Sequence, residues 1–167
     1  NMPPLAKFLL FYEKYPHKFI VKIYGQSSEW DKYNSLIKYP NCFDLQIRPI
    51  QNEEIANLFA NSDYLILPYK DVTQSGPLLI SYYYNVPVIA SDHDGFKEYI
   101  IDKEIGFLFK NMNYIDLYNK MCYVIENFDK NIVIRKKLQK FITTNIKTEK
   151  IIEMYIKGFD KIISINN

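Results

Sequence analysis

The chain has 167 residues, 48% of them hydrophobic, which is enough for one well-packed domain and too few for two ordinary ones. Its 21 basic and 19 acidic residues are spread along the whole length and leave a net charge of +2, so the sequence shows no electrostatic footprint for nucleic acid or for an anionic membrane. No apolar run approaches the length that spans a bilayer, and Cys42 and Cys122 lie far apart in apolar stretches, as core thiols do. We therefore expect one cytoplasmic domain without a signal peptide.

Hydrophobic patterns in the first part of the chain alternate between helical and strand spacing. Apolar residues three and four apart predict a helix over Pro4 to Tyr15, and a β-branched and aromatic run that stops at Gly25 predicts the first strand. The predicted elements that follow the first helix are a strand over Phe19 to Tyr24, a helix capped by Ser27 or Ser28 and running from Trp30 to Ile37, a strand over Phe43 to Ile47, a helix from Asn52 through Phe59, and a strand over Tyr64 to Leu67.

The second part of the chain begins with a polar loop after Pro68 and continues the alternation. Gly76 and Pro77 suit the start of a helix that reaches Tyr84, and Asn85 stands where a left-handed cap would end it. The remaining predicted elements are strands over Val86 to Ala90 and Gly106 to Phe109, a short helix from the Asp94-Gly95 turn to Ile101, and helices from Asn113 onward with breaks near Asp129 and Thr144 and a terminal helix from Lys147 to Ile163.

Strands that alternate with helices and are apolar on both faces indicate a parallel sheet covered on both sides. We therefore predict a doubly wound, Rossmann-like α/β domain with a helical C-terminal tail. Ligands of such sheets bind beyond the carboxyl ends of the strands. The site is expected in the loops that follow Tyr24, Ile47, Leu67 and Ala90.

The segment from Asp71 to Pro77 joins a predicted strand end to a predicted helix start, where backbone N–H groups are free and the helix dipole is positive. Gly76 would let a ligand approach the backbone, and Thr73 and Ser75 add hydroxyl donors, features of a phosphate or diphosphate cradle. The alternative is that Ser75 only caps the helix. With no Walker lysine and no glycine triplet of the dinucleotide fingerprint, nucleoside triphosphates and NAD are disfavoured.

Several segments resemble, in order and spacing, the carboxy-terminal domain of retaining GT-B glycosyltransferases of family 4. The segments that carry the resemblance are Lys22 to Gly25, Arg48 to Ile50, Phe59 to Pro68, Gly76 to Leu79, Asn85 to Asp92, Gly95 to Ile100 and Ile105 to Leu108. The resemblance implies that residues 1–167 form a single nucleotide-sugar-binding domain, the C-terminal half of a GT-B enzyme. In this reading the domain's first strand and the N-terminal acceptor-binding domain lie outside the sequence.

The resemblance implies a glycosyltransferase that moves a sugar from a nucleotide diphosphate donor to a glycan or lipid-linked acceptor, with retention, as in bacterial polysaccharide biosynthesis. The base and ribose are expected near Gly25, Arg48 and Ile50. The donor diphosphate and sugar are expected on the turn formed by Thr73, Gln74, Ser75 and Gly76. The expected partners are the donor and the acceptor-binding domain, and no nucleic acid, cofactor or metal is expected. The full-length enzyme is expected in the cytoplasm. Peripheral association with the inner face of the membrane is the alternative location.

The chain departs from the family pattern at two catalytic features. The family carries a pair of glutamates that contact the donor sugar and the ribose. Setting the stretch from Pro77 to Leu79 on its equivalent in the family puts Val72 and Ile80 at those positions. Asp71 lies beside the first position and is the candidate for its catalytic role. In the family a basic Arg and Lys pair, which follows the domain's first strand, neutralises the donor diphosphate. This pair is expected to precede residue 1, so we expect the isolated domain to be inactive. A glycosyltransferase-like module without catalysis, or a nucleotide-sugar epimerase-type domain, remain the alternatives.

Two further features have more than one interpretation. His93 follows a strand end on the ligand side of the sheet. It either contacts a phosphate or sugar hydroxyl or is an ordinary turn residue. Its neighbours Asp92 and Asp94 fit a hydrogen-bonded turn better than a metal site. The Lys- and Ile-rich stretch from Ile132 to Lys140 is amphipathic. Its apolar side is expected in the core, and contact with a membrane surface is the alternative.

Overall fold

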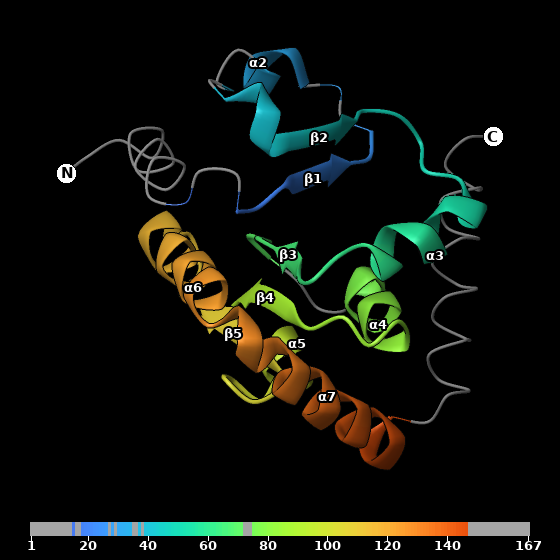
Figure 1. The fold of residues 1–167 in the computed structure, drawn as a ribbon, viewed down its shortest axis with the longest axis vertical. Helices are drawn as coiled ribbons and strands as arrows, with labels where there is room; N and C mark the ends of the chain where they lie inside the picture. Colours follow the sequence, from blue (N-terminus) through green and yellow to red (C-terminus); the bar gives the residue numbers. More distant parts are fainter. Residues whose placement is uncertain are drawn as a thin grey trace.

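The computed structural model describes residues 15, 18–26, 28, 30–34, 37, 39–71 and 75–146, and the predicted helices over Pro4 to Tyr15 and Lys147 to Ile163 lie outside these residues apart from Tyr15 itself. Strands and helices alternate along the described residues, as predicted (Figure 1). The elements are β1 (Val21–Tyr24), α2 (Trp30–Asn34), η1 (Pro40–Cys42), β2 (Phe43–Gln46), α3 (Asn52–Ala60), β3 (Leu65–Leu67), α4 (Gly76–Tyr83), β4 (Val88–Ser91), α5 (Asp94–Lys97), β5 (Gly106–Phe109), α6 (Tyr114–Glu126), η2 (Phe128–Lys130) and α7 (Asn131–Asn145).

All strand pairs in the described residues are parallel, as predicted, but the pairing falls into two sheets. β1 pairs with β2, with Val21 opposite Phe43, and β3, β4 and β5 form a second sheet in that order. Figure 1 shows the strands following one another in the order β2, β1, β3, β4 and β5, so the division falls between β1 and β3. Lys22 Nζ donates a hydrogen bond of 2.5 Å to the carbonyl oxygen of Asn61, which links β1 to the chain just before β3.

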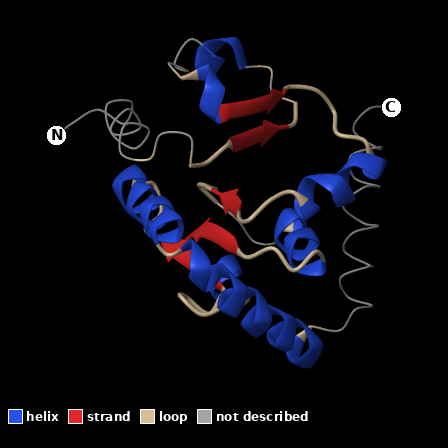
Figure 2. Cartoon of the chain, in the orientation of Figure 1, coloured by secondary structure: helices blue, strands red, loops and turns tan. Residues whose placement is uncertain are grey.

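The sheet of β3, β4 and β5 is covered on both faces, because successive residues of β4 point to opposite sides. Val88 and Ala90 pack in a buried cluster with residues of α4, α5 and α7, whereas Ile89 packs in a second cluster with β5, α6 and α7. α7 contributes Ile134 to the second cluster and Leu138 to the first. The cartoon in Figure 2 shows these helices around the strands, and the arrangement confirms the doubly wound interpretation.

Local backbone features explain where several elements end. Asn85 has a φ of 55° directly after α4, the left-handed cap predicted from the sequence. Gly106 is required by close packing, since a Cβ there would lie 2.8 Å from the carbonyl oxygen of Val88 on the neighbouring strand. β4 begins at Val88, later than predicted, because Pro87 has no N–H to donate to a ladder.

α7 confirms that the apolar side of the Ile132 to Lys140 stretch packs in the core. Ile134 and Leu138 are buried, and Phe141 packs against the same cluster as Leu138. The break predicted near Asp129 is the 3-10 turn η2. None of the helices in the described ranges combines the length and apolarity needed to cross a bilayer.

Candidate functional site

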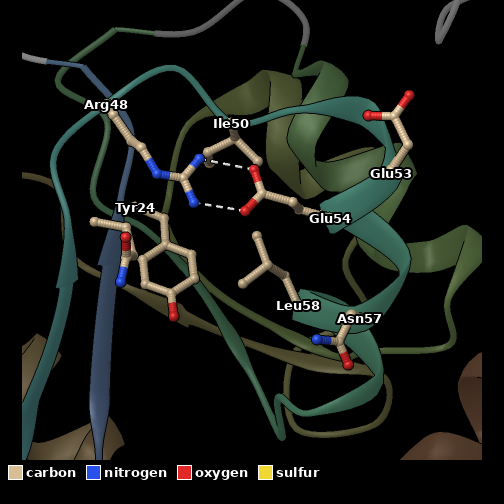
Figure 3. A pocket seen from close by; sticks show the side chains of 8 residues that line it. Tyr24, Arg48, Ile50, Glu53, Glu54, Asn57 and Leu58 are labelled. Carbon is tan, nitrogen blue, oxygen red and sulfur yellow. Dashed lines mark hydrogen bonds and ion pairs between the residues drawn. The ribbon is translucent and has the colours of Figure 1, made fainter.

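A cavity of about 330 Å³ lies beyond the carboxyl ends of β1 and β2, where the sheet topology predicts ligand binding. β1 and β2 supply Tyr24 and Gln46, the loop after β2 supplies Arg48 and Ile50, and the first two turns of α3 supply the rest. The lining residues are Tyr24, Gln46, Arg48, Ile50, Glu53, Glu54, Asn57 and Leu58 (Figure 3). The walls are therefore part aromatic, part aliphatic and part charged.

Arg48 and Glu54 form a two-pronged ion pair at this cavity. The two guanidinium nitrogens of Arg48 donate to the two carboxylate oxygens of Glu54 at 2.8 and 2.6 Å, the two dashed contacts in Figure 3. The Gln51 N–H also donates to Glu54, at 2.9 Å, so that Glu54 closes a capping box at the start of α3. The hydrogen bonds from Arg48 and Gln51 lower the pKa of Glu54 to about 2, so the pair is charged at neutral pH but carries no net charge.

The floor of the cavity is fixed by β1 and the turn after it. The hydroxyl of Tyr24 donates to Asp44 on β2 at 2.5 Å, and that hydrogen bond is the main reason why the pKa of Tyr24 is raised. Gly25 has a φ of 140°, a conformation that side chains disfavour, and its N–H donates to the carbonyl of Gln46. An added Cβ at Gly25 would meet no atom within 4 Å, so the turn leaves open space beside the backbone.

The start of α4 forms the second part of the site. Ser75 is the N-cap, and its Oγ accepts a hydrogen bond of 3.3 Å from the Leu78 N–H, which is the capping role set out as the alternative to phosphate binding. The hydroxyl proton of Ser75 is still available to donate to a ligand. A Cβ built on Gly76 meets no atom within 4 Å, so the backbone at the positive end of α4 is open to an approaching group.

Three side chains at or just after the carboxyl ends of β4 and β5 hold the backbone that leads toward this turn. Ser91 Oγ donates to the carbonyl of Tyr69 at 2.8 Å, and the amide of Asn111 donates to the carbonyl of Lys70 at 3.0 Å. His93 Nε2 lies 3.2 Å from the same Tyr69 carbonyl and donates to it when that nitrogen is protonated. His93 is thus a positioning residue in this structure, and a direct contact with a phosphate or sugar remains a prediction.

The structure brings together Arg48 and Ile50, with Gly25 on the adjoining turn, and places Ser75 and Gly76 at the start of α4. Asp71 is exposed at the end of its described segment. Val72, Thr73 and Gln74 lie outside the described residues. Ile80 is half-buried on α4, where it offers no hydrogen-bond acceptor to a ligand.

Sequence reasoning missed several residues that line the cavity. Glu54 could have been found, because it follows Gln51 at capping-box spacing, although the box begins one residue before the Asn52 start expected for this helix. Tyr24 and Leu58 carry no sequence signal beyond being apolar residues of a strand and a helix. Asp92, considered beside His93, accepts a hydrogen bond of 2.7 Å from the Asn111 N–H, a contact between two loops that was not predicted.

Comparisons with known proteins identify the relatives of this arrangement. The family model described as "Glycosyl transferases group 1" matches residues 7–127. TarM from S. aureus superposes with a TM-score of 0.74 at 20% identity, over 92% of this chain and 31% of TarM. HepE from Anabaena in complex with UDP superposes with a TM-score of 0.71 at 15% identity, over 95% of this chain and 44% of HepE. The C-terminal domain of LpcC from Francisella tularensis superposes with a TM-score of 0.72 at 17% identity, over 86% of this chain and 77% of the LpcC domain.

At these identities the superpositions establish the fold, and they confirm the predicted carboxy-terminal GT-B domain. The chain spans about a third of TarM and less than half of HepE. No curated protein sequence matches it significantly.

Proposed function

Because the chain belongs to the group 1 glycosyl transferases, we propose that it is the donor-binding domain of an enzyme that transfers a sugar from a nucleotide diphosphate to a glycan or lipid-linked acceptor, with retention at the anomeric carbon. The observation that carries this proposal is the cavity of about 330 Å³ beyond β1 and β2, which opens at the ligand-binding edge of the fold. Complexes of HepE with UDP and with UDP-glucose support a nucleotide-sugar donor.

The cavity suits the base and ribose better than the phosphates. Tyr24, Ile50 and Leu58 provide an aromatic and aliphatic wall for a flat ring. The positive charge of Arg48 is neutralised by Glu54, so Arg48 offers no unpaired positive charge to a phosphate. Asn57 adds an amide that can both donate and accept hydrogen bonds with a base edge or a ribose hydroxyl.

The diphosphate is assigned to the start of α4. The helix dipole, the open backbone at Gly76 and the remaining hydroxyl proton of Ser75 all favour an anion there. Thr73 and Gln74 complete this turn in the proposal, and Asp71 takes the place of the family's first glutamate beside the donor sugar. Ser91, His93 and Asn111 support the turn by fixing the backbone at Tyr69 and Lys70.

The proposal is tested by titrating the chain with UDP, GDP, ADP and CDP in a calorimeter, using Ser75→Asp and Ser75→Asn as a matched pair. Both substitutions keep a good N-cap, so the fold should persist, but only aspartate puts a negative charge at the start of α4. We expect one nucleotide to bind the wild type and Ser75→Asn, and Ser75→Asp to bind it at least about tenfold more weakly, ~1.4 kcal/mol. Equal binding by the two variants contradicts the assignment of the diphosphate.

A glycosyltransferase-like module without catalysis is the second candidate, and Ile80 is the observation that favours it. This apolar side chain stands at the family's second glutamate position and cannot bond ribose hydroxyls. Ile80→Glu restores the acid on a half-buried helix face. If Ile80→Glu raises the affinity for the nucleotide that binds, the domain keeps a donor site that lacks one contact. If no nucleotide binds either form, the non-catalytic module is the better account.

Activity is proposed only for the assembled enzyme. We place the acceptor pocket in an N-terminal domain and the enzyme in the cytoplasm, associated with the inner face of the membrane where lipid-linked acceptors reside. The departing diphosphate needs stabilisation of its developing charge, which the family's basic pair would supply. The isolated chain is therefore expected to bind donor without transferring or hydrolysing it, which release of labelled sugar from a UDP-sugar would measure.

A further inference from the structure

A second hollow lies at the amino end of β5, whereas the proposed diphosphate turn follows the carboxyl end of β3. It has a volume of about 320 Å³, and its walls come from the turn before β5, β5 itself, the last turn of α6, η2 and the start of α7. Three of its eight lining residues are lysines and one is a glutamate, so we call it the basic hollow. It shares no residue with the cavity beyond β1 and β2.

Two of the three lysines carry a positive charge without a counter-ion. Lys137 Nζ lies 3.4 Å from Glu104, a loose ion pair. Lys130 Nζ donates a hydrogen bond of 2.7 Å to the side-chain oxygen of Asn127, which is neutral. Neither Lys103 nor Lys130 forms an ion pair within the part of the chain that the structure describes. The basic hollow therefore offers two unpaired positive charges to an anion.

The turn that carries Lys103 is held by its own hydrogen bonds. Lys103 has a φ of 64°, and its N–H donates to the carbonyl of Gly106 at 2.8 Å. The carboxylate of Asp102 accepts a hydrogen bond of 2.8 Å from the Leu108 N–H. Residues in such sparsely populated conformations persist where the surrounding contacts fix them. Little backbone freedom is therefore left to lose when an anion binds at this turn.

An aromatic and aliphatic wall completes the basic hollow. The ring of Tyr123 is 41% exposed and packs edge-on against buried Phe107, with 5.5 Å between the ring centres. Lys130 Nζ lies 5.7 Å from the centre of the Tyr123 ring, and Val133, also on the wall, is 54% exposed. The electron-rich face of an aromatic ring attracts the slightly positive C–H groups of a pyranose. The carboxylate of Glu104 can accept hydrogen bonds from sugar hydroxyls.

We infer that the basic hollow binds a phosphorylated monosaccharide, with its phosphate at Lys103 and Lys130 and its sugar ring on Tyr123. A phosphate monoester carries about −1.5 to −2 charges at neutral pH, which matches the two unpaired lysines better than a single carboxylate does. Ligand pockets range from about 300 to 1,000 Å³, so a hollow of about 320 Å³ holds one ring with its phosphate. This site is separate from the donor cavity and goes beyond the proposed function.

The test is calorimetric titration of the chain with glucose 6-phosphate, glucose 1-phosphate and mannose 6-phosphate, and with the free sugars and inorganic phosphate. At least one ester should bind about tenfold more tightly than either of its parts. Lys103→Gln with Lys130→Gln should weaken that binding at least about tenfold, because the charge-assisted hydrogen bonds are lost. Lys136→Gln with Lys140→Gln removes two exposed lysines of α7 outside the hollow, and this charge-matched control should bind within about twofold of the wild type.

The contact with the sugar ring is tested separately by Tyr123→Leu. This variant should bind the ester about fivefold more weakly and inorganic phosphate as the wild type does, with the fold checked by circular dichroism. The inference is overturned if no ester binds, if inorganic phosphate binds as tightly as the esters, or if the two lysine pairs lose binding equally.

The donor site is kept apart from the basic hollow by titrating Ser75→Asp with the same ester. Ser75 lies at the start of α4 and does not line the hollow, so this variant should bind the ester unchanged. Loss of ester binding in Ser75→Asp would place the ester on the diphosphate turn and overturn the inference. Nucleotide binding without ester binding refutes the basic hollow alone, and ester binding without nucleotide binding refutes the donor site alone.

Discussion

Gly106→Ala is predicted to destabilise the domain because β4 and β5 leave no room for a methyl group at this position. Gly106 lies opposite Val88 in the parallel ladder. An added Cβ would lie 2.8 Å from the Val88 carbonyl oxygen and 3.3 Å from Ile100 Cγ2. The first contact is with backbone, so relief requires the two strands to separate by a few tenths of an ångström within a buried core.

Forcing an extra carbon into a packed core costs about 1–3 kcal/mol, and the rigidity of the neighbouring strand places this case near 2–3 kcal/mol. For a domain of this size each kcal/mol lowers the melting temperature by about 2–4 °C, so a fall of about 4–12 °C is expected. Urea denaturation followed by circular dichroism measures the free energy of unfolding directly.

Gly76→Ala is the matched control, since its Cβ meets no atom within 4 Å and its backbone is already helical. We expect this control to change the free energy of unfolding by less than about 0.5 kcal/mol. If Gly106→Ala unfolds at the same urea concentration as Gly76→Ala, the close approach of β5 to β4 does not constrain this position and the reasoning is refuted.

Three other outcomes follow from contacts already described. Gly76→Ala should weaken nucleotide binding while leaving stability unchanged, because its methyl group occupies the space where a phosphate would approach; equal affinity in a calorimetric titration would argue against that approach. Tyr82→Phe should cost about 1–2 kcal/mol in a denaturation assay, since the buried hydroxyl donates to the Tyr99 carbonyl at 2.8 Å, whereas the exposed Tyr83→Phe should be silent. The pKa of Glu54 falls from 4.5 to about 2 on folding, so its contribution to stability is present above pH 4.5 and is lost as pH falls toward 2. Acid unfolding of Glu54→Gln, followed by circular dichroism, should therefore depend less on pH in that range than that of the wild type, and parallel curves would contradict the ion pair.

The order of strands and helices could be predicted because the signals are local. β3 is a continuous apolar run, and the left-handed cap at Asn85 follows from a residue type that tolerates positive φ. The division of the strands between two sheets could not be predicted, since which strands pair is decided by contacts between segments far apart in sequence. Strand pattern alone indicates that a strand exists and not which partner it takes.

The candidate site divides in the same way. Arg48 and Ile50 were predicted near the ligand from their place after a strand, and the structure puts both on the cavity wall. The partner of Arg48 was not predicted, because a surface arginine can reach many carboxylates and only the fold selects Glu54. The link from His93 to the Tyr69 carbonyl was missed for a similar reason, since it joins backbone and side chain across 24 residues.

Arg135 stabilises the fold from a position far from the residues that would contact the ligand. From α7, its guanidinium donates to the carbonyls of Ser62 at 2.8 Å and Asn85 at 3.2 Å, just before β3 and β4 begin. This brace sits at the amino ends of the strands, whereas the residues that would select a donor lie at the carboxyl ends. Libraries that randomise 48–50 and 71–74 therefore leave both the brace and the Ser75 cap of α4 intact, and new donor preferences should be obtainable at little cost in stability.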